Sequence, residues 1–116
     1  MTVQEWEIKQ AYKRLSTALQ DAYDLTEDML AAKATVALAV GEAVLDGRID
    51  GKNESTRESQ ARRLFPAEYK RLDETEGWVR LTRHRVEMQR LEVDEVRARL
   101  RLAELAAQAV AQTAAE

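Results

Sequence analysis

The stretch VLDGRIDGKNESTR, residues 44–57, separates two long segments that both have helical character. It holds two of the chain's four glycines, and Gly47 and Asp50-Gly51 are typical of helix ends and tight turns. Ser55, with Glu58 three residues later, forms a capping box, which indicates the start of a new helix. We therefore predict that the two long segments are joined by a turn at residues 47–54.

The segment before this turn has no proline and one glycine, and its apolar or small residues recur three and four positions apart, as on one face of a helix. These residues are Ile8, Tyr12, Leu15, Leu19, Ala22, Met29, Val36, Val40 and Ala43. The DLTED stretch at residues 24–28 resembles a second helix start, because Thr26 is followed by two acids. A break there is the alternative to the continuous helix that we predict over about residues 3–46.

After the turn we predict a short helix over residues 55–64, ended by Phe65-Pro66. Proline is tolerated in the first turn of a helix and restricts the residue before it, so Pro66 is expected to begin the next helix. That long helix is predicted over residues 66–114. Gly77 is its weak point, costing about 1 kcal/mol relative to alanine.

The last predicted helix carries two apolar series with a spacing near 3.5 residues, as in coiled coils. The first apolar series is Val79, Val86, Val93, Val96, Leu100, Ala103, Ala107 and Val110, and the second apolar series is Leu81, Met88, Leu91, Ala98, Leu102, Leu105 and Ala109. At about 100° per residue the two series lie on opposite sides of the helix. One side can pack on the first helix, and the other then needs a second copy of the chain or a different protein.

Composition agrees with a single all-α domain over residues 1–116, because charged residues make up 34% of the chain, aromatic residues 5%, and glycine and proline together number five. We predict an elongated antiparallel helical hairpin that forms a homodimeric four-helix bundle or coiled coil. Residues 1–51 carry nine acids and five bases, whereas residues 52–101 carry thirteen bases and ten acids. Such opposed charges would attract each other within the hairpin.

The sequence offers no catalytic, cofactor-binding or metal-binding constellation. There is no cysteine, and His84, the single histidine, falls on the side of the second apolar series. The loop fails as a phosphate loop, since a spacer residue is missing and Asn53 replaces the required Ser or Thr. It also fails as an EF-hand, because Arg48 and Arg57 would occupy ligand positions. We expect neither an enzyme nor a metalloprotein.

Arginines at Arg83, Arg90, Arg97 and Arg101 recur on one side of the last helix and form a candidate nucleic-acid face. Acidic residues such as Glu87 and Asp94 are interleaved with them, so a solvated or ion-paired surface is the alternative interpretation. No segment reaches the roughly 20 apolar residues of a membrane span, and no signal peptide is evident. We expect a cytoplasmic protein.

The motif Gly51-Lys52-Asn53, followed by Arg57 and Gln60 and flanked by two long charged helices, resembles uncharacterised small phage and prophage helical-hairpin proteins. The resemblance covers residues 44–105 in pattern but about five residues in identity. It implies a setting in viral DNA recombination or replication, within the host cytoplasm. Phe65-Pro66 departs from the smoother helix of that pattern.

These observations predict a non-enzymatic helical interaction or scaffolding protein. Gly51, Lys52, Asn53 and Arg57 are the candidate turn or partner motif. The alternatives are direct nucleic-acid binding through the arginine face, and inhibition of a host protein by the acidic first half.

Overall fold

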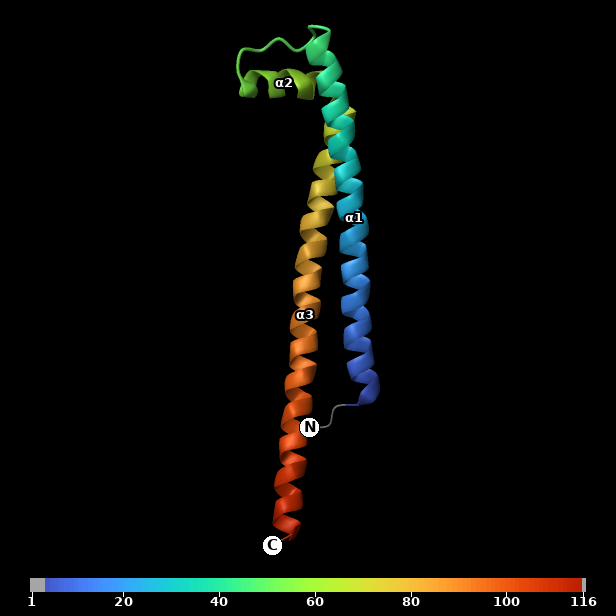
Figure 1. The fold of residues 1–116 in the computed structure, drawn as a ribbon, viewed down its shortest axis with the longest axis vertical. Coiled ribbons are helices and arrows are strands. Elements are labelled where there is room, and N and C mark those ends of the chain that lie inside the picture. The colour runs from blue at the N-terminus through green and yellow to red at the C-terminus, as the bar shows by residue number, and fades with distance from the viewer. Residues whose placement is uncertain (1–3, 116) are drawn as a thin grey trace. The chain divides into compact units, whose positions relative to one another are not determined.

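The computed structural model describes residues 4–115, which form three helices and no strand. They are α1 (Glu5–Leu45), α2 (Glu54–Leu64) and α3 (Pro66–Ala115), and they are shown in Figure 1. The predicted all-α helical hairpin is therefore confirmed as the fold class. α1 continues through residues 24–28 without a break, and α3 begins at Pro66 and passes through Gly77. The predicted start of the first helix at residue 3 lies outside the described residues.

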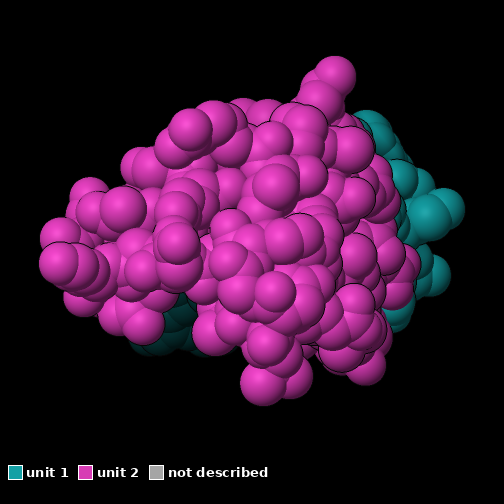
Figure 2. Space-filling view, turned by 90° about the horizontal axis from the view of Figure 1, so that it is seen from above, with its two compact units in different colours: residues 1–22, 82–116 teal, residues 23–81 magenta. Residues whose placement is uncertain are grey.

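The chain divides into two compact units, coloured separately in Figure 2. Unit 1 combines the residues up to Ala22 with those from Thr82 onward, and unit 2 is the segment Tyr23–Leu81. Both α1 and α3 contribute one segment to each unit.

In unit 1 the segments of α1 and α3 lie antiparallel (Figure 1). They share an apolar seam. Ala11 packs with Val93 and Val96, with Ile8 and Leu15 against them. The buried and half-buried residues are alternately three and four apart on both helices, which is the coiled-coil spacing. Apart from the charged residues at its edge, they are Ile8, Ala11, Leu15, Ala18 and Ala22 on α1, and Thr82, Val86, Gln89, Val93, Val96, Leu100 and Ala103 on α3.

This seam corrects part of the predicted α1 stripe. Tyr12 and Leu19 are 47% and 43% exposed, whereas their neighbours Ala11 and Ala18 are buried. Alanines at these positions leave room for the valines of α3 and let the two backbones approach closely. The large residues therefore lie beside the seam rather than in it.

Three ion pairs along one edge of the seam fix the register of unit 1. Glu7 pairs with Arg99 at 3.3 Å between Oε2 and Nη2, Arg14 pairs with Glu92, and Asp21 accepts a hydrogen bond from Arg85 at 3.1 Å. On each helix the sign of the charge alternates every seven residues. A slip of one heptad would therefore place like charges opposite each other, which disfavours the neighbouring registers.

In unit 2 the loop after α1 folds back onto the helices. Ala43, Ile49 and Ala61 are buried together, with Val40, Phe65 and Tyr69 packed against them. Further seam residues of this unit, buried or half-buried, are Leu25, Met29, Ala32, Val36, Leu72, Thr75 and Val79. Ile49 anchors the loop, since it is 3% exposed and its backbone N–H bonds to the carbonyl oxygen of Ala43 at 3.1 Å.

The ends of α1 and α2 differ in part from the prediction. Gly47 has φ +82°, the left-handed conformation that favours glycine just after a helix, as expected. α2, however, begins at Glu54 and not at residue 55, and its N-cap is Asn53, whose side chain accepts a hydrogen bond from the Thr56 N–H at 2.9 Å. The predicted Ser55–Glu58 capping box is therefore wrong, because Asn53 caps the helix two residues earlier.

Candidate interaction surfaces

The loop motif is held by a single glutamine rather than by a tight turn at Asp50-Gly51. Gln60 Oε1 accepts hydrogen bonds from the backbone N–H groups of Asp50 and Gly51 at 3.2 and 2.9 Å. Gln60 Nε2 donates to Asp50 Oδ1 at 2.8 Å. The Gln60 side chain thus replaces the backbone hydrogen bonds that the predicted turn would have made, and together with the buried Ile49 it holds the loop in its path.

Close packing also explains why residue 51 is glycine. A Cβ atom on Gly51 would come within 2.9 Å of Thr56 Cγ2 and 3.0 Å of the Arg57 backbone nitrogen. Arg57 Nε in turn donates to the carbonyl oxygen of Asn53 at 3.3 Å. Gly51, Asn53 and Arg57 therefore shape the start of α2, while Lys52 between them is exposed.

A second arginine secures the other end of the loop. Arg48 donates to Asp46 through its Nε at 2.8 Å and its backbone N–H at 3.1 Å, and its guanidinium lies 5.7 Å from the centre of the Phe65 ring. The side-chain and backbone hydrogen bonds from Arg48 lower the pKa of Asp46 below its usual value. The pair therefore contributes above the usual aspartate pKa and is lost as pH falls through the lowered pKa, although its exposure keeps the effect small.

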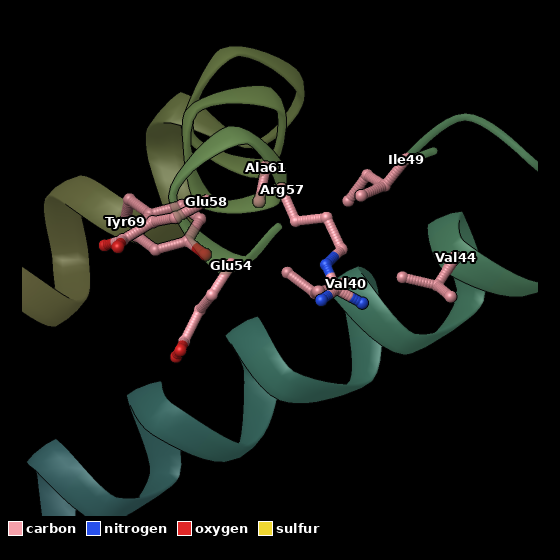
Figure 3. A pocket seen from close by; sticks show the side chains of 8 residues that line it. All are labelled: Val40, Val44, Ile49, Glu54, Arg57, Glu58, Ala61 and Tyr69. Carbon is pink, nitrogen blue, oxygen red and sulfur yellow. The ribbon is translucent and has the colours of Figure 1, made fainter. Parts of the chain in front are cut away.

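A hollow of about 490 Å³ lies in unit 2 between α1, the loop and α2 (Figure 3). Val40, Val44 and Ile49 give it an apolar floor, and Arg57 extends from α2 toward Val40. Its remaining lining residues are Glu54, Glu58, Ala61 and Tyr69. Arg57 of the predicted turn motif thus lines this hollow.

The two apolar series of α3 have opposite environments. Val79, Val86, Val93 and Val96 of the first apolar series are buried, and Leu100 is half-buried. Farther along, Val110 is 69% exposed, which corrects the predicted extent of this series. The reason lies in α1, which begins at Glu5 and pairs near there with Arg99, so that α3 continues beyond its partner in unit 1.

The second apolar series is exposed along its length in the single chain. Its five large residues are exposed as follows: Leu81 69%, Met88 50%, Leu91 61%, Leu102 62% and Leu105 44%. Ala98 and Ala109 are exposed as well. Together with His84, Glu95 and Gln112 these residues continue the three-and-four spacing from Leu81 to Gln112. One helix therefore carries two coiled-coil faces, of which α1 covers one.

The predicted arginine face lies beside the seam of unit 1, away from the three ion pairs. Arg83 and Arg90 line a hollow of about 370 Å³ with Leu19, Ala22, His84, Val86 and Glu87. Arg90 lies 3.5 Å from Glu87, and Arg101 lies 3.6 Å from Glu104, both within α3. Arg97 is exposed. These pairs are local and solvent-exposed, so they leave the arginines accessible.

Neither a metal cluster nor a membrane span is found within residues 4–115. No group of three or more potential ligand residues is close enough to hold a metal ion there. In the same part of the chain, no helix combines the length and apolar character needed to cross a bilayer.

Comparison with known proteins adds no relative: no family model, curated protein or solved structure matches this chain.

Proposed function

We propose that the chain is a non-enzymatic helical interaction module that binds a second copy of itself through the second apolar series of α3. The observation that carries this proposal is the exposure of Leu81, Met88, Leu91, Leu102 and Leu105 on one helix at coiled-coil spacing. Five large apolar side chains in one line are costly to leave in water, at about 25 cal/mol per Å² of apolar surface. Scattered exposed leucines would not support the same inference, but a continuous heptad face does.

The geometry favours a particular kind of assembly. Because the two faces of α3 lie on opposite sides, a partner helix on the second face would place α3 between α1 and that partner. This arrangement differs from a four-helix bundle, in which each helix contacts its two neighbours through faces that are about 90° apart around the helix axis. The resemblance to small phage helical-hairpin proteins adds a setting in viral DNA recombination or replication, in which such a module would link other proteins.

Light scattering and sedimentation of three forms of the chain test the proposal. The wild type is expected to be a dimer at micromolar concentration, whereas Leu91→Lys with Leu102→Lys should yield a folded monomer. Leu38→Lys with Leu45→Lys is the matched control, because Leu38 and Leu45 of α1 are also exposed, at 68% and 90%. A wild type that stays monomeric at near-millimolar concentration, or a dimer unaffected by the first pair of changes, would refute the proposal.

A second candidate function is nucleic-acid binding through Arg83, Arg90, Arg97 and Arg101. The observation in its favour is that these arginines are exposed and lie apart from the acids of α1 that pair with Arg85 and Arg99. If all four contact phosphates, the logarithm of the affinity for duplex DNA should fall with the logarithm of salt concentration with a slope of about −3.6.

Replacing the four arginines with alanine should remove this binding. Replacing the exposed cations Lys13, Lys33, Arg63 and Lys70 changes the net charge equally and should leave most of the binding in place. Absence of any DNA or RNA complex at low salt would exclude this second function without contradicting the proposed interaction module.

A further inference from the structure

The charges beside the second apolar series have an order that suits one partner in particular. Glu92 and Arg99 lie along one edge of this face, and Asp94 and Arg101 lie along the other. On both edges an acid is followed seven residues later by an arginine. A face of this kind is complementary to a second copy of itself that runs in the opposite direction.

We propose that two α3 helices pair antiparallel through this face about a two-fold axis between Glu95 and Ala98. This inference rests on the proposed function and specifies its partner and register. Leu91 then faces Leu102 of the second copy, Met88 faces Leu105, and Glu95 faces Ala98. Each of these contacts occurs twice, because the axis repeats it.

In this register both edges of the interface are matched in charge. Glu92 faces Arg99 of the second copy and Asp94 faces Arg101, which gives four ion pairs across the dimer. The Glu92 and Arg99 side chains are 32% and 29% exposed and already pair with Arg14 and Glu7 of their own chain. Across the dimer they would join those pairs into a continuous charged network along one edge.

The neighbouring arrangements are disfavoured by the same residues. A slip of one heptad in one direction places Arg99 opposite Arg99 and Arg101 opposite Arg101, and a slip in the other places Glu92 opposite Glu92 and Asp94 opposite Asp94. Parallel pairing in register would set Arg80 beside Arg85 and Glu87 beside Glu92, against one attractive pair of Asp94 with Arg99. Like charges at these short distances are repulsive, so the antiparallel register is the one that the charges select.

The length of α3 agrees with this register. Of the described residues after Arg99, only Leu100 and Ala103 are half-buried, and Leu102, Leu105 and Ala109 are exposed where α3 extends beyond α1. In the antiparallel dimer this extension lies along Leu91, Met88 and His84 of the second copy. Each chain thereby covers the exposed apolar residues in the middle of the other chain's α3, and the extension acquires a binding role.

Disulfide trapping tests the register, since the chain has no cysteine of its own. Leu91→Cys and Leu102→Cys, prepared separately and then mixed and mildly oxidised, should form a covalent dimer of one of each. Either variant alone should remain unlinked, because two residues 91 would lie about 16 Å apart along the helix axis. Leu91→Cys linking to itself would indicate parallel pairing and overturn the proposal. The proposal would also be overturned if the chain dimerises but the mixture of the two variants forms no disulfide-linked dimer.

Charge reversal provides an independent readout. Asp94→Arg and Arg101→Asp should each weaken the dimer about tenfold, because each places two pairs of like charges across the interface. The double variant should restore wild-type affinity, whereas Lys13→Asp, an exposed reversal on α1, should have little effect. Additive weakening in the double variant would refute the register.

The outcomes separate this inference from the proposed function. A monomeric wild type would refute both the self-association and the register. A dimer that is not trapped by the mixed disulfide, or whose affinity is not restored by the double charge reversal, would refute the antiparallel register alone. Circular dichroism of every variant confirms that the helices remain folded.

Discussion

At the scale of single residues, the start of α2 depends on one side chain that the sequence pattern did not select. Asn53 caps α2 by accepting from the Thr56 N–H, and its carbonyl oxygen also accepts from the Arg57 N–H at 3.1 Å. A Ser-x-x-Glu pattern starting at Ser55 is equally well formed in the sequence. In the structure Asn53 takes the cap position, and Gln60 of α2 holds Asp50 and Gly51 of the loop just before it.

Asn53→Ala should therefore destabilise the chain by about 1 kcal/mol, the usual cost of losing an N-cap. Ser55→Ala is the control and should leave stability within about 0.5 kcal/mol of wild type, because Ser55 lies inside the first turn of α2. Urea unfolding of the two variants measures both values. A larger loss for Ser55→Ala than for Asn53→Ala would contradict the assignment of the cap.

Gln89 of α3 is a second residue whose side chain affects the stability of the chain. It occupies a seam position of α3 between Val86 and Val93, and its Oε1 is buried without a hydrogen-bond partner in the structure. A buried acceptor that lacks a partner costs about 1–3 kcal/mol. The seam of unit 1 is therefore less stable than its spacing alone would suggest.

Gln89→Leu should stabilise the chain by about 1 kcal/mol, since leucine removes the buried acceptor and adds apolar surface to the seam. Gln10→Leu, an exposed change on α1, is the matched control and should be close to neutral. Thermal unfolding at a single protein concentration compares the stability of the two variants with that of the wild type. A destabilised Gln89→Leu would indicate that the amide is satisfied, for instance by an ordered water molecule.

At the scale of elements, the sequence predicted each helix but not the residues that join α1 to α3. Proline, glycine and the three-and-four spacing are local signals, and they located the three helices to within about two residues. The residues of the seam were harder to predict, because the buried Ala11 and Ala18 are small whereas the neighbouring Tyr12 and Leu19 are large. Hydrophobicity favours the larger residues, whereas close packing of two helices favours the smaller ones, and only the position of α3 decides between them.

The register of unit 1 could be checked through the Asp21–Arg85 pair. Asp21→Arg or Arg85→Asp alone should destabilise the chain by about 0.5–1 kcal/mol, because each places like charges opposite each other at an exposed site. The double variant restores an attractive pair and should recover most of the loss, which a double-mutant cycle measures directly. Purely additive losses would show that these two residues do not interact in solution.

At the scale of the whole molecule, what the sequence could not provide is the partner of the second apolar series. The periodicity identified two faces on α3, and the fold assigned α1 to one of them by burying Val79, Val86, Val93 and Val96. In the dimer that we propose, the charge order on the other face favours a second copy in antiparallel orientation. The extension of α3 beyond Arg99 is the part of the chain whose role depends most on this assembly.

A chain that ends at Leu100 should therefore keep its fold and lose its ability to dimerise. Among the described residues of the removed segment only Ala103 is half-buried and the others are exposed, so at low concentration the truncated and full-length chains should melt within about 3 °C of each other. As the concentration rises, the Tm of the full-length dimer should increase by mass action, while that of the truncated chain should stay constant. A truncated chain whose Tm still rises with concentration would place the self-association elsewhere. A large loss of Tm at low concentration would instead mean that the extension stabilises its own chain.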